Sequence, residues 1–139
     1  NIKHQEEIGQ YLLSAPESSV SEVVHVAGAR PAAPTDIIAQ TGGRPTDQLG
    51  AAAWMIDMAN YVNSVTGHSN IVIQFGYGVP TSTIKPGSMA IVVYQESTAA
   101  HDEAAAALRM DEGYLRRMAS VNDYFDMSSF FNILMRKLV

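Results

Sequence analysis

Four polar side chains that can take part in catalysis or ligand binding stand in apolar, strand-like segments of the chain. They are His25, Gln74, Tyr94 and Asn132. Successive side chains of a strand point to opposite faces of its sheet. If Ile71, Ile73 and Phe75 face the helices, the opposite face presents all four polar groups. The sequence therefore predicts a site on the sheet face that lies away from the helices.

The wall around this predicted site is apolar. It consists of Val72, Val92 and Leu134. Because histidine titrates near neutral pH, His25 is suited to act as a general base. Asn132 or Gln74 would stabilise an enolate, and Tyr94 would help to orient an aromatic or polyketide-like ligand. The alternative is that these polar groups only bond to one another or lie in a dimer interface. The assignment also depends on the register of each strand, because a shift of one residue moves every side chain to the other face of the sheet.

The other three histidines, His4, His68 and His101, are expected at the surface. The string His101-Asp102-Glu103 resembles a metal-binding set, but adjacent positions on a helix point in different directions. The chain has no cysteine, which excludes disulfides, thiolate metal sites and a cysteine nucleophile. We therefore expect neither a metal site nor a cofactor, including haem bound through His25.

A glycine-rich segment, residues 41–46, leads into a predicted helix and offers a possible anion site. The N-terminus of a helix attracts anions, and Arg44 would add its charge. The segment lacks the lysine and the spacing of a phosphate loop. A plain loop followed by an ordinary helix cap at Thr46 or Asp47 is the favoured interpretation.

The elements that must position these residues follow from apolar periodicity. Strands are predicted at residues 20–29, 69–77, 88–95 and 128–139, and helices at residues 5–13, 47–66, 98–110 and 111–121. Residues 30–45 contain three prolines and the pair Gly42-Gly43, so a long loop is expected there. The last segment also has a helical interpretation, because Phe130, Leu134 and Leu138 recur at a spacing of four.

This order of elements predicts an α+β fold: a ferredoxin-like βαββαβ sheet with helices on one face, preceded by an extra N-terminal helix. We assign residues 1–19 to that helix and its linker, and residues 20–139 to a single domain. Gly67 is expected to end the helix over residues 47–66. A chain of 139 residues is long enough to bury a core without disulfides.

Charge and hydropathy exclude several classes of partner. The net charge is −5 and the basic residues are scattered, which argues against nucleic-acid binding. No apolar run approaches the roughly 20 residues that span a bilayer. We therefore expect a soluble protein of the cytoplasm. The start at Asn1 rather than Met predicts that an initiator, a leader or an engineered tag has been removed.

A series of junctions in the second half of the chain carries a family resemblance. The first are a helix that ends at Gly67, a strand over residues 70–73 and a second strand that ends with residues 93–97. A helix over residues 101–108, the turn Asp111-Glu112-Gly113-Tyr114 and a closing strand follow. This series resembles the dimeric α/β-barrel superfamily, which includes NIPSNAP-like proteins and antibiotic-biosynthesis monooxygenases. The resemblance implies that two subunits pair their sheets, with a cavity between or within the subunits.

A second apolar stripe on the predicted helix over residues 47–66 also favours a partner. It includes Trp54, Met58 and Tyr61, and its alternative is a core position within the chain. Two functions remain open for the predicted homodimer. One is a small-molecule binder or cofactor-free oxygenase or isomerase acting on an apolar, enolisable substrate in the sheet cavity. The other is a non-catalytic assembly protein that uses the sheet and the N-terminal helix as interfaces.

Overall fold

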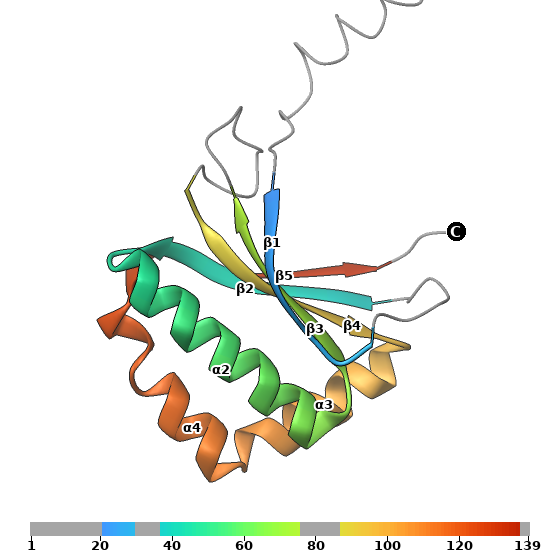
Figure 1. Cartoon of the computed structure of the whole chain (residues 1–139). Coiled ribbons are helices and arrows are strands. Elements are labelled where there is room, and N and C mark those ends of the chain that lie inside the picture. Colours follow the sequence, from blue (N-terminus) through green and yellow to red (C-terminus); the bar gives the residue numbers. More distant parts are fainter. Residues whose placement is uncertain (1–20, 30–36, 76–86, 137–139) are drawn as a thin grey trace, which may run out of the picture.

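The computed structural model describes residues 21–29, 37–75 and 87–136, which form one antiparallel sheet with helices packed on one face (Figure 1). The strands are β1 (Ser21–Ala27), β2 (Ile37–Pro45), β3 (Ser69–Phe75), β4 (Met89–Gln95) and β5 (Phe125–Arg136). The helices are α2 (Gln48–Thr66), α3 (Thr98–Arg109), α4 (Glu112–Met118) and the short 3-10 helix η1 (Val121–Asp123). None of the helices in these ranges is long and apolar enough to cross a membrane.

The strand order is β1-β3-β4-β2-β5, and every neighbouring pair is antiparallel. Strands β2, β3, β4 and β5, with α2 between the first two and α3 and α4 between the last two, form the ferredoxin-like βαββαβ unit. Strand β1 is an additional edge strand beside β3. The predicted α+β fold with helices on one face is confirmed, and the last segment is a strand, as favoured.

The first strand of this unit is not the one that the sequence predicts. Residues 37–45, expected in a long loop, form β2, which lies between β4 and β5. The pair Gly42-Gly43, which favours a loop, instead allows close strand contact: a Cβ atom on Gly42 would collide with the backbone of Met89 and Ala90. The predicted first strand, residues 20–29, contains β1 at the edge, where Val23 and Val26 are exposed rather than buried.

The helix boundaries follow the predicted capping signals. Asp47 accepts a hydrogen bond from the backbone N–H of Gly50 at the start of α2. Gly67 ends this helix with φ at 75°, a left-handed conformation that glycine adopts without strain. Ser97 and Asp111 cap α3 and α4 in the same way as Asp47 caps α2. These caps fix where each helix starts relative to the preceding strand or turn.

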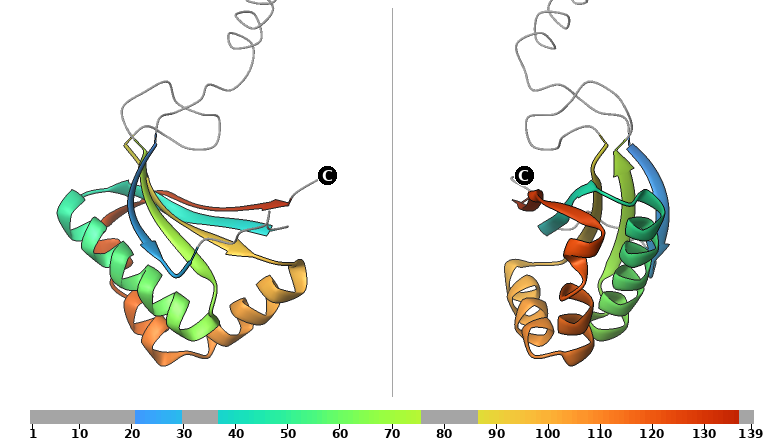
Figure 2. Two further views of the ribbon diagram at one scale, coloured as in Figure 1. Left: turned by 45° about the vertical axis from the view of Figure 1, so that its right-hand side comes forward. Right: turned by 90° about the vertical axis from the view of Figure 1, so that its left-hand side faces the viewer.

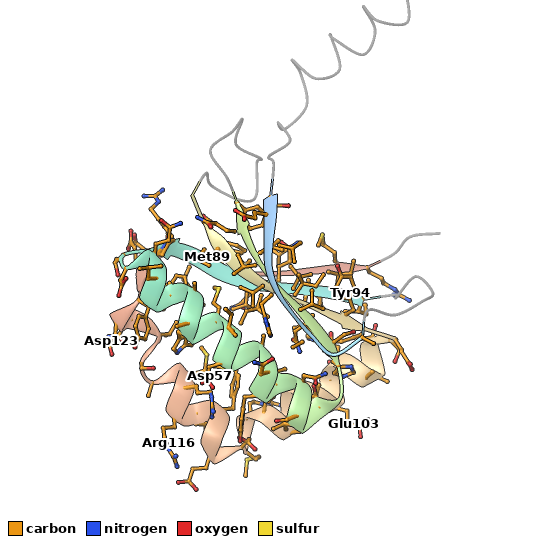
Figure 3. All side chains as sticks on the ribbon, viewed as in Figure 1. Asp57, Met89, Tyr94, Glu103, Arg116 and Asp123 are labelled. Atoms are coloured by element: carbon orange, nitrogen blue, oxygen red, sulfur yellow. The ribbon has the colours of Figure 1, made fainter. Side chains whose placement is uncertain are left out.

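The two faces of β3 are the reverse of the predicted ones, whereas Tyr94 and Val92 of β4 lie away from the helices as predicted. Val72, Met89 and Ile91 pack with α2, and Met89 lies between β4 and this helix (Figure 3). Phe75 packs on the other side of the sheet, against Ala90, and Ile73 joins that second cluster. All three helices lie on one side of the sheet in both views of Figure 2. The assumption that Ile71, Ile73 and Phe75 face the helices is therefore wrong.

The second apolar stripe of α2 is covered by α4 within the same chain. Trp54 is 9% exposed, and its Nε1 atom donates to the carbonyl oxygen of Arg117 at 3.0 Å. Met58 is buried, and the hydroxyl of Tyr61 donates to Asp111. The expected protein interface through Trp54, Met58 and Tyr61 is thus replaced by the intrachain alternative. The predicted N-terminal helix over residues 5–13 lies outside the described residues, so the division at residue 19 stays a prediction.

Candidate functional site

A cavity of about 340 Å³ lies between the sheet and the helices that cover it. This volume is in the range of pockets that hold small organic molecules. Most of its wall is apolar, including Trp54, Met55, Met58, Ile91, Leu108 and Met118. The cavity is therefore on the helix-covered face of the sheet, and not on the opposite face, where the sequence predicts a site.

A histidine on α3 and a glutamine at the end of β4 form a polar pair on the cavity wall. The Nδ1 atom of His101 lies 2.7 Å from Oε1 of Gln95. An amide oxygen can only accept, so Nδ1 carries the proton in this pair, and in the neutral imidazole Nε2 is the nitrogen with the free lone pair. Gln95 is 5% exposed, so the surrounding side chains restrict the orientation of its amide group. A histidine in this tautomer is prepared to accept a proton at Nε2.

A second polar pair comes from facing positions on β2 and β5. Thr41 and Asn132 are partners in the β2–β5 register, so their side chains share the helix-covered face. The hydroxyl of Thr41 donates to Oδ1 of Asn132 at 2.6 Å. This bond occupies the amide oxygen of Asn132 and leaves its Nδ2 group to donate elsewhere. Asn132 lines the cavity and is also exposed to solvent.

Asn70 on β3 also lines the cavity and is fully buried. Its Nδ2 atom donates to the carbonyl oxygens of Ala59 at 3.2 Å and His68 at 2.9 Å. Its Oδ1 atom has no hydrogen-bond partner among the described residues. Asn70 on β3 and Asn132 on β5 both line the cavity and are three strands apart in the sheet order, a spacing of about 14 Å across the strands.

The charge of the cavity wall is opposite in sign to that of the whole chain. The chain has a net charge of −5, yet no Asp or Glu is among the described residues that line the cavity. The ionisable basic groups on the wall are His68, His101 and Arg109. Such a wall favours an anionic group or a negative charge that develops during a reaction.

A network of polar contacts joins α2 to both ends of α4. Arg117 binds Asp57 on α2 at 2.7 Å and lies 4.0 Å from the ring centre of Tyr61 (Figure 3, where Asp57 is labelled). The hydroxyl of Tyr61 donates to Asp111, and this bond lowers the pKa of Asp111 and raises the pKa of Tyr61. The hydrogen bond to Asp57 raises the pKa of Arg117. These contacts hold α4 against α2.

Tyr114 connects that network to the cavity. It follows the capping residue Asp111, which accepts a hydrogen bond from its backbone N–H at 2.8 Å. Its side chain lines the cavity, and burial raises the pKa of its hydroxyl. The hydroxyl of Tyr114 is therefore neutral and able to donate a hydrogen bond at physiological pH.

The structure brings only one of the predicted polar residues to the cavity. Asn132 lines it, whereas Nε2 of His25 lies 2.8 Å from Oδ1 of Asn60 on α2, away from the cavity wall. Gln74 shares the helix-covered face with its register partner Met89 but does not line the cavity. Tyr94 lies on the face away from the helices, as predicted, because its register partners are Ser69 and Ile38, but the cavity is on the other face.

The predicted apolar wall is divided in the same way. Val72 is in the core on the helix-covered face, Leu134 is 55% exposed, and Val92 belongs to the opposite face. Arg44 is exposed in β2 rather than in a loop, and its backbone N–H donates to Ser129 Oγ at 2.8 Å. The anion site at Arg44 stays a prediction.

Two of the residues expected at the surface lie on the cavity wall instead. His68 and His101 are half-buried there, while His4 lies outside the described ranges. The sequence missed His101 because its partner Gln95 belongs to the preceding strand, and only the turn through Glu96 and Ser97 brings them together. Within residues 21–29, 37–75 and 87–136, no three His, Asp or Glu side chains are grouped as metal ligands would be.

Comparison with known proteins adds a likeness in fold. No protein-family model matches the chain, and no curated protein matches it in sequence. A solved structure described as "Crystal structure study of anthrone oxidase-like protein" superposes with a TM-score of 0.64 at 12% identity. The alignment covers 96% of this chain and 65% of that one. At this identity the likeness shows a shared fold.

Proposed function

We propose that the protein binds an apolar, enolisable aromatic molecule in the cavity and oxygenates it without a cofactor. The observation that carries this proposal is the pairing of His101 with Gln95 on the wall of an otherwise apolar cavity. The bond at Nδ1 leaves Nε2 as the proton acceptor. His101 replaces His25 as the proposed general base, because His25 is bonded to Asn60 away from the cavity.

The proposed reaction begins with proton transfer to Nε2 of His101 from a CH₂ group that is conjugated with a carbonyl group, which in anthrone lies across the central ring. The resulting enolate places negative charge on the carbonyl oxygen. The Nδ2 group of Asn132, whose Oδ1 is bonded to Thr41, donates to that oxygen. The absence of Asp and Glu from the described cavity wall avoids repulsion of this charge.

Molecular oxygen is the oxidant in this proposal. The enolate carbon transfers electrons to O₂ and forms a carbon–oxygen bond, and the peroxide that results loses water. The sum is CH₂ + O₂ → C=O + H₂O, in which carbon loses four electrons and the two oxygen atoms gain them. If O₂ does not reach the enolate, reprotonation at another carbon gives isomerisation instead.

The fold neighbour is consistent with this chemistry. It is described as anthrone oxidase-like, and an anthrone is an enolisable aromatic ketone. Because the chain spans 65% of that neighbour, the carry-over of activity is part of the proposal. Anthrone itself is therefore the first substrate to test.

We also propose that two copies of the chain pair through the sheet face that carries no helix. Val23 and Val26 on β1 and Met135 on β5 belong to this face by register, and all three are at least 40% exposed. Exposed apolar groups at both margins of one face are typical of an interface. This face equally supports the second candidate function, a non-catalytic assembly protein.

Oxygen uptake with anthrone tests the proposed function. We expect the wild-type protein to consume one O₂ per anthrone and His101→Ala to be at least about 100-fold slower, the usual contribution of a general base. The control is His25→Ala, which removes a histidine outside the cavity and should keep the wild-type rate. Equal rates for His101→Ala and the wild type would contradict the assignment of the base, and a wild-type protein without turnover would favour the assembly role.

A further inference from the structure

We propose that Asn70 selects ligands that carry a hydroxyl group, by accepting a hydrogen bond from that group at its Oδ1 atom. The inference rests on the proposed function, because it names the class of ligand for the same cavity: a hydroxylated aromatic molecule.

The orientation of the Asn70 amide is fixed by its neighbours. Its Nδ2 atom lies 3.2 Å from the carbonyl oxygen of Ala59 and 2.9 Å from that of His68. Both partners can only accept, so the nitrogen must be the atom that faces them. The remaining atom, Oδ1, is a buried acceptor without a donor among the described residues. Buried acceptors are rarely left without a partner, and a ligand that supplies one gains affinity.

The position of Asn70 relates this acceptor to the proposed catalytic pair. Asn70 faces Val93 in the β3–β4 register, and Gln95 is the next residue of β4 on the same face. Diagonal neighbours of this kind are about 7–8 Å apart. Since Gln95 binds His101, a hydroxyl group at Asn70 and the carbon that His101 deprotonates fall within one fused-ring ligand.

The chemistry of the wall distinguishes a hydroxyl group from a cationic donor. An ammonium group would also donate to Oδ1 of Asn70. The cavity holds His68, His101 and Arg109 and no described carboxylate, so a buried cation would have no counter-charge. A neutral hydroxyl group satisfies the acceptor without that cost. The apolar side chains around it suit an aromatic ring, which makes a phenol the simplest probe.

The test compares 2-naphthol with 2-methoxynaphthalene, which has no hydroxyl donor. Binding is followed by the fluorescence of Trp54, the single tryptophan of the chain, which lines the cavity. We expect the wild-type protein to bind 2-naphthol at least about tenfold more tightly, the effect of one well-formed hydrogen bond to a buried group. In Asn70→Ala this ratio of dissociation constants should fall to near one.

The matched control is Gln74→Ala, which removes a polar side chain from the same face of β3 outside the cavity and should keep the wild-type ratio. An equal ratio in Asn70→Ala and the wild type would overturn the role of Asn70. Two ligands that bind the wild type equally well would also overturn it, while leaving the cavity as a binding site. If neither ligand bound the wild type, the proposed function would fail together with this inference.

A second measurement decides the question if Asn70→Ala does not fold, because Asn70 also joins β3 to α2. It is a crystal structure of the wild-type protein with 2-naphthol. The ligand oxygen is expected about 2.5–3.0 Å from Oδ1 of Asn70. A ligand oxygen that points elsewhere in the cavity would overturn the proposal.

Discussion

The Nδ1 atom of His101 lies 2.7 Å from Oε1 of Gln95, so the last residue of a strand sets the tautomer of a histidine on the following helix. The cap at Ser97, which accepts from the backbone N–H of Ala100, fixes where that helix begins. One short strand-to-helix turn therefore supplies both the proposed base and the group that orients it.

Gln95 is expected to act on the reaction through His101. Gln95→Leu removes the acceptor at Nδ1 and should lower kcat by about tenfold to a hundredfold, the range known for outer partners of functional histidines. The KM for anthrone should change little. Gln95→Glu keeps an acceptor but adds a negative charge beside the proposed base and should move the pH–rate profile to higher pH. A purely structural role for Gln95 would leave the pH–rate profile of Gln95→Glu unmoved.

Asp111 is expected to make stability depend on pH. Its pKa is lowered in the folded state, chiefly by the hydrogen bond from Tyr61, so its contribution is present above the unfolded pKa. That contribution is lost as pH falls through the lowered folded value. Urea denaturation of the wild type and Asp111→Asn should therefore differ in midpoint at pH 7, and the difference should shrink as the pH falls below about 4. A difference that grows on acidification would contradict this sign.

A substitution at Gly42 tests the close contact between β2 and β4. Gly42→Ala places a Cβ atom against the backbone of Met89 and Ala90 and should reduce the free energy of unfolding by about 1–3 kcal/mol. Gln40→Ala, two residues earlier on the same face of β2, is the matched control and should cost less. The two values are obtained by urea denaturation. Equal stability of Gly42→Ala and the wild type would indicate a looser contact between β2 and β4.

The proposed dimer is tested by lysine substitutions on the sheet face that carries no helix. Val26→Lys and Met135→Lys place a lysine on that face and should convert a dimer to a monomer in analytical ultracentrifugation. Leu49→Lys is the control, because Leu49 is 85% exposed on α2 and lies on the other side of the sheet. A wild-type protein that is already monomeric at micromolar concentration would contradict the proposed pairing.

Local signals in the sequence predicted local structure well. Asp47 and Gly67 mark helix ends by mechanisms that act within a few residues, and the structure shows both caps. The apolar run over residues 89–94 predicted β4 for the same reason. The pair Gly42-Gly43 failed as a loop signal because its role, close contact between β2 and β4, depends on residues more than 40 positions away.

The position of the cavity could not be predicted, because the sequence does not show which face of the sheet the helices cover. In β3 both faces are apolar: Val72 lies on one side, and Ile71 and Phe75 lie on the other. Alternation then gives no preference for which side the helices cover, and choosing the wrong side reversed the faces of β1, β3 and β5, while Tyr94 and Val92 of β4 lie away from the helices as predicted. Asn132 was placed correctly on the face of Val72, but the helices cover that face.

The most direct test of His101 as the general base is solvent deuterium exchange without oxygen. Anthrone is incubated with the protein in deuterated buffer under anaerobic conditions, and incorporation at its CH₂ group is followed by NMR. We predict that the wild type and His25→Ala accelerate incorporation and that His101→Ala does not. Equal acceleration by His101→Ala, or none by the wild type, would contradict proton abstraction by His101 in this cavity.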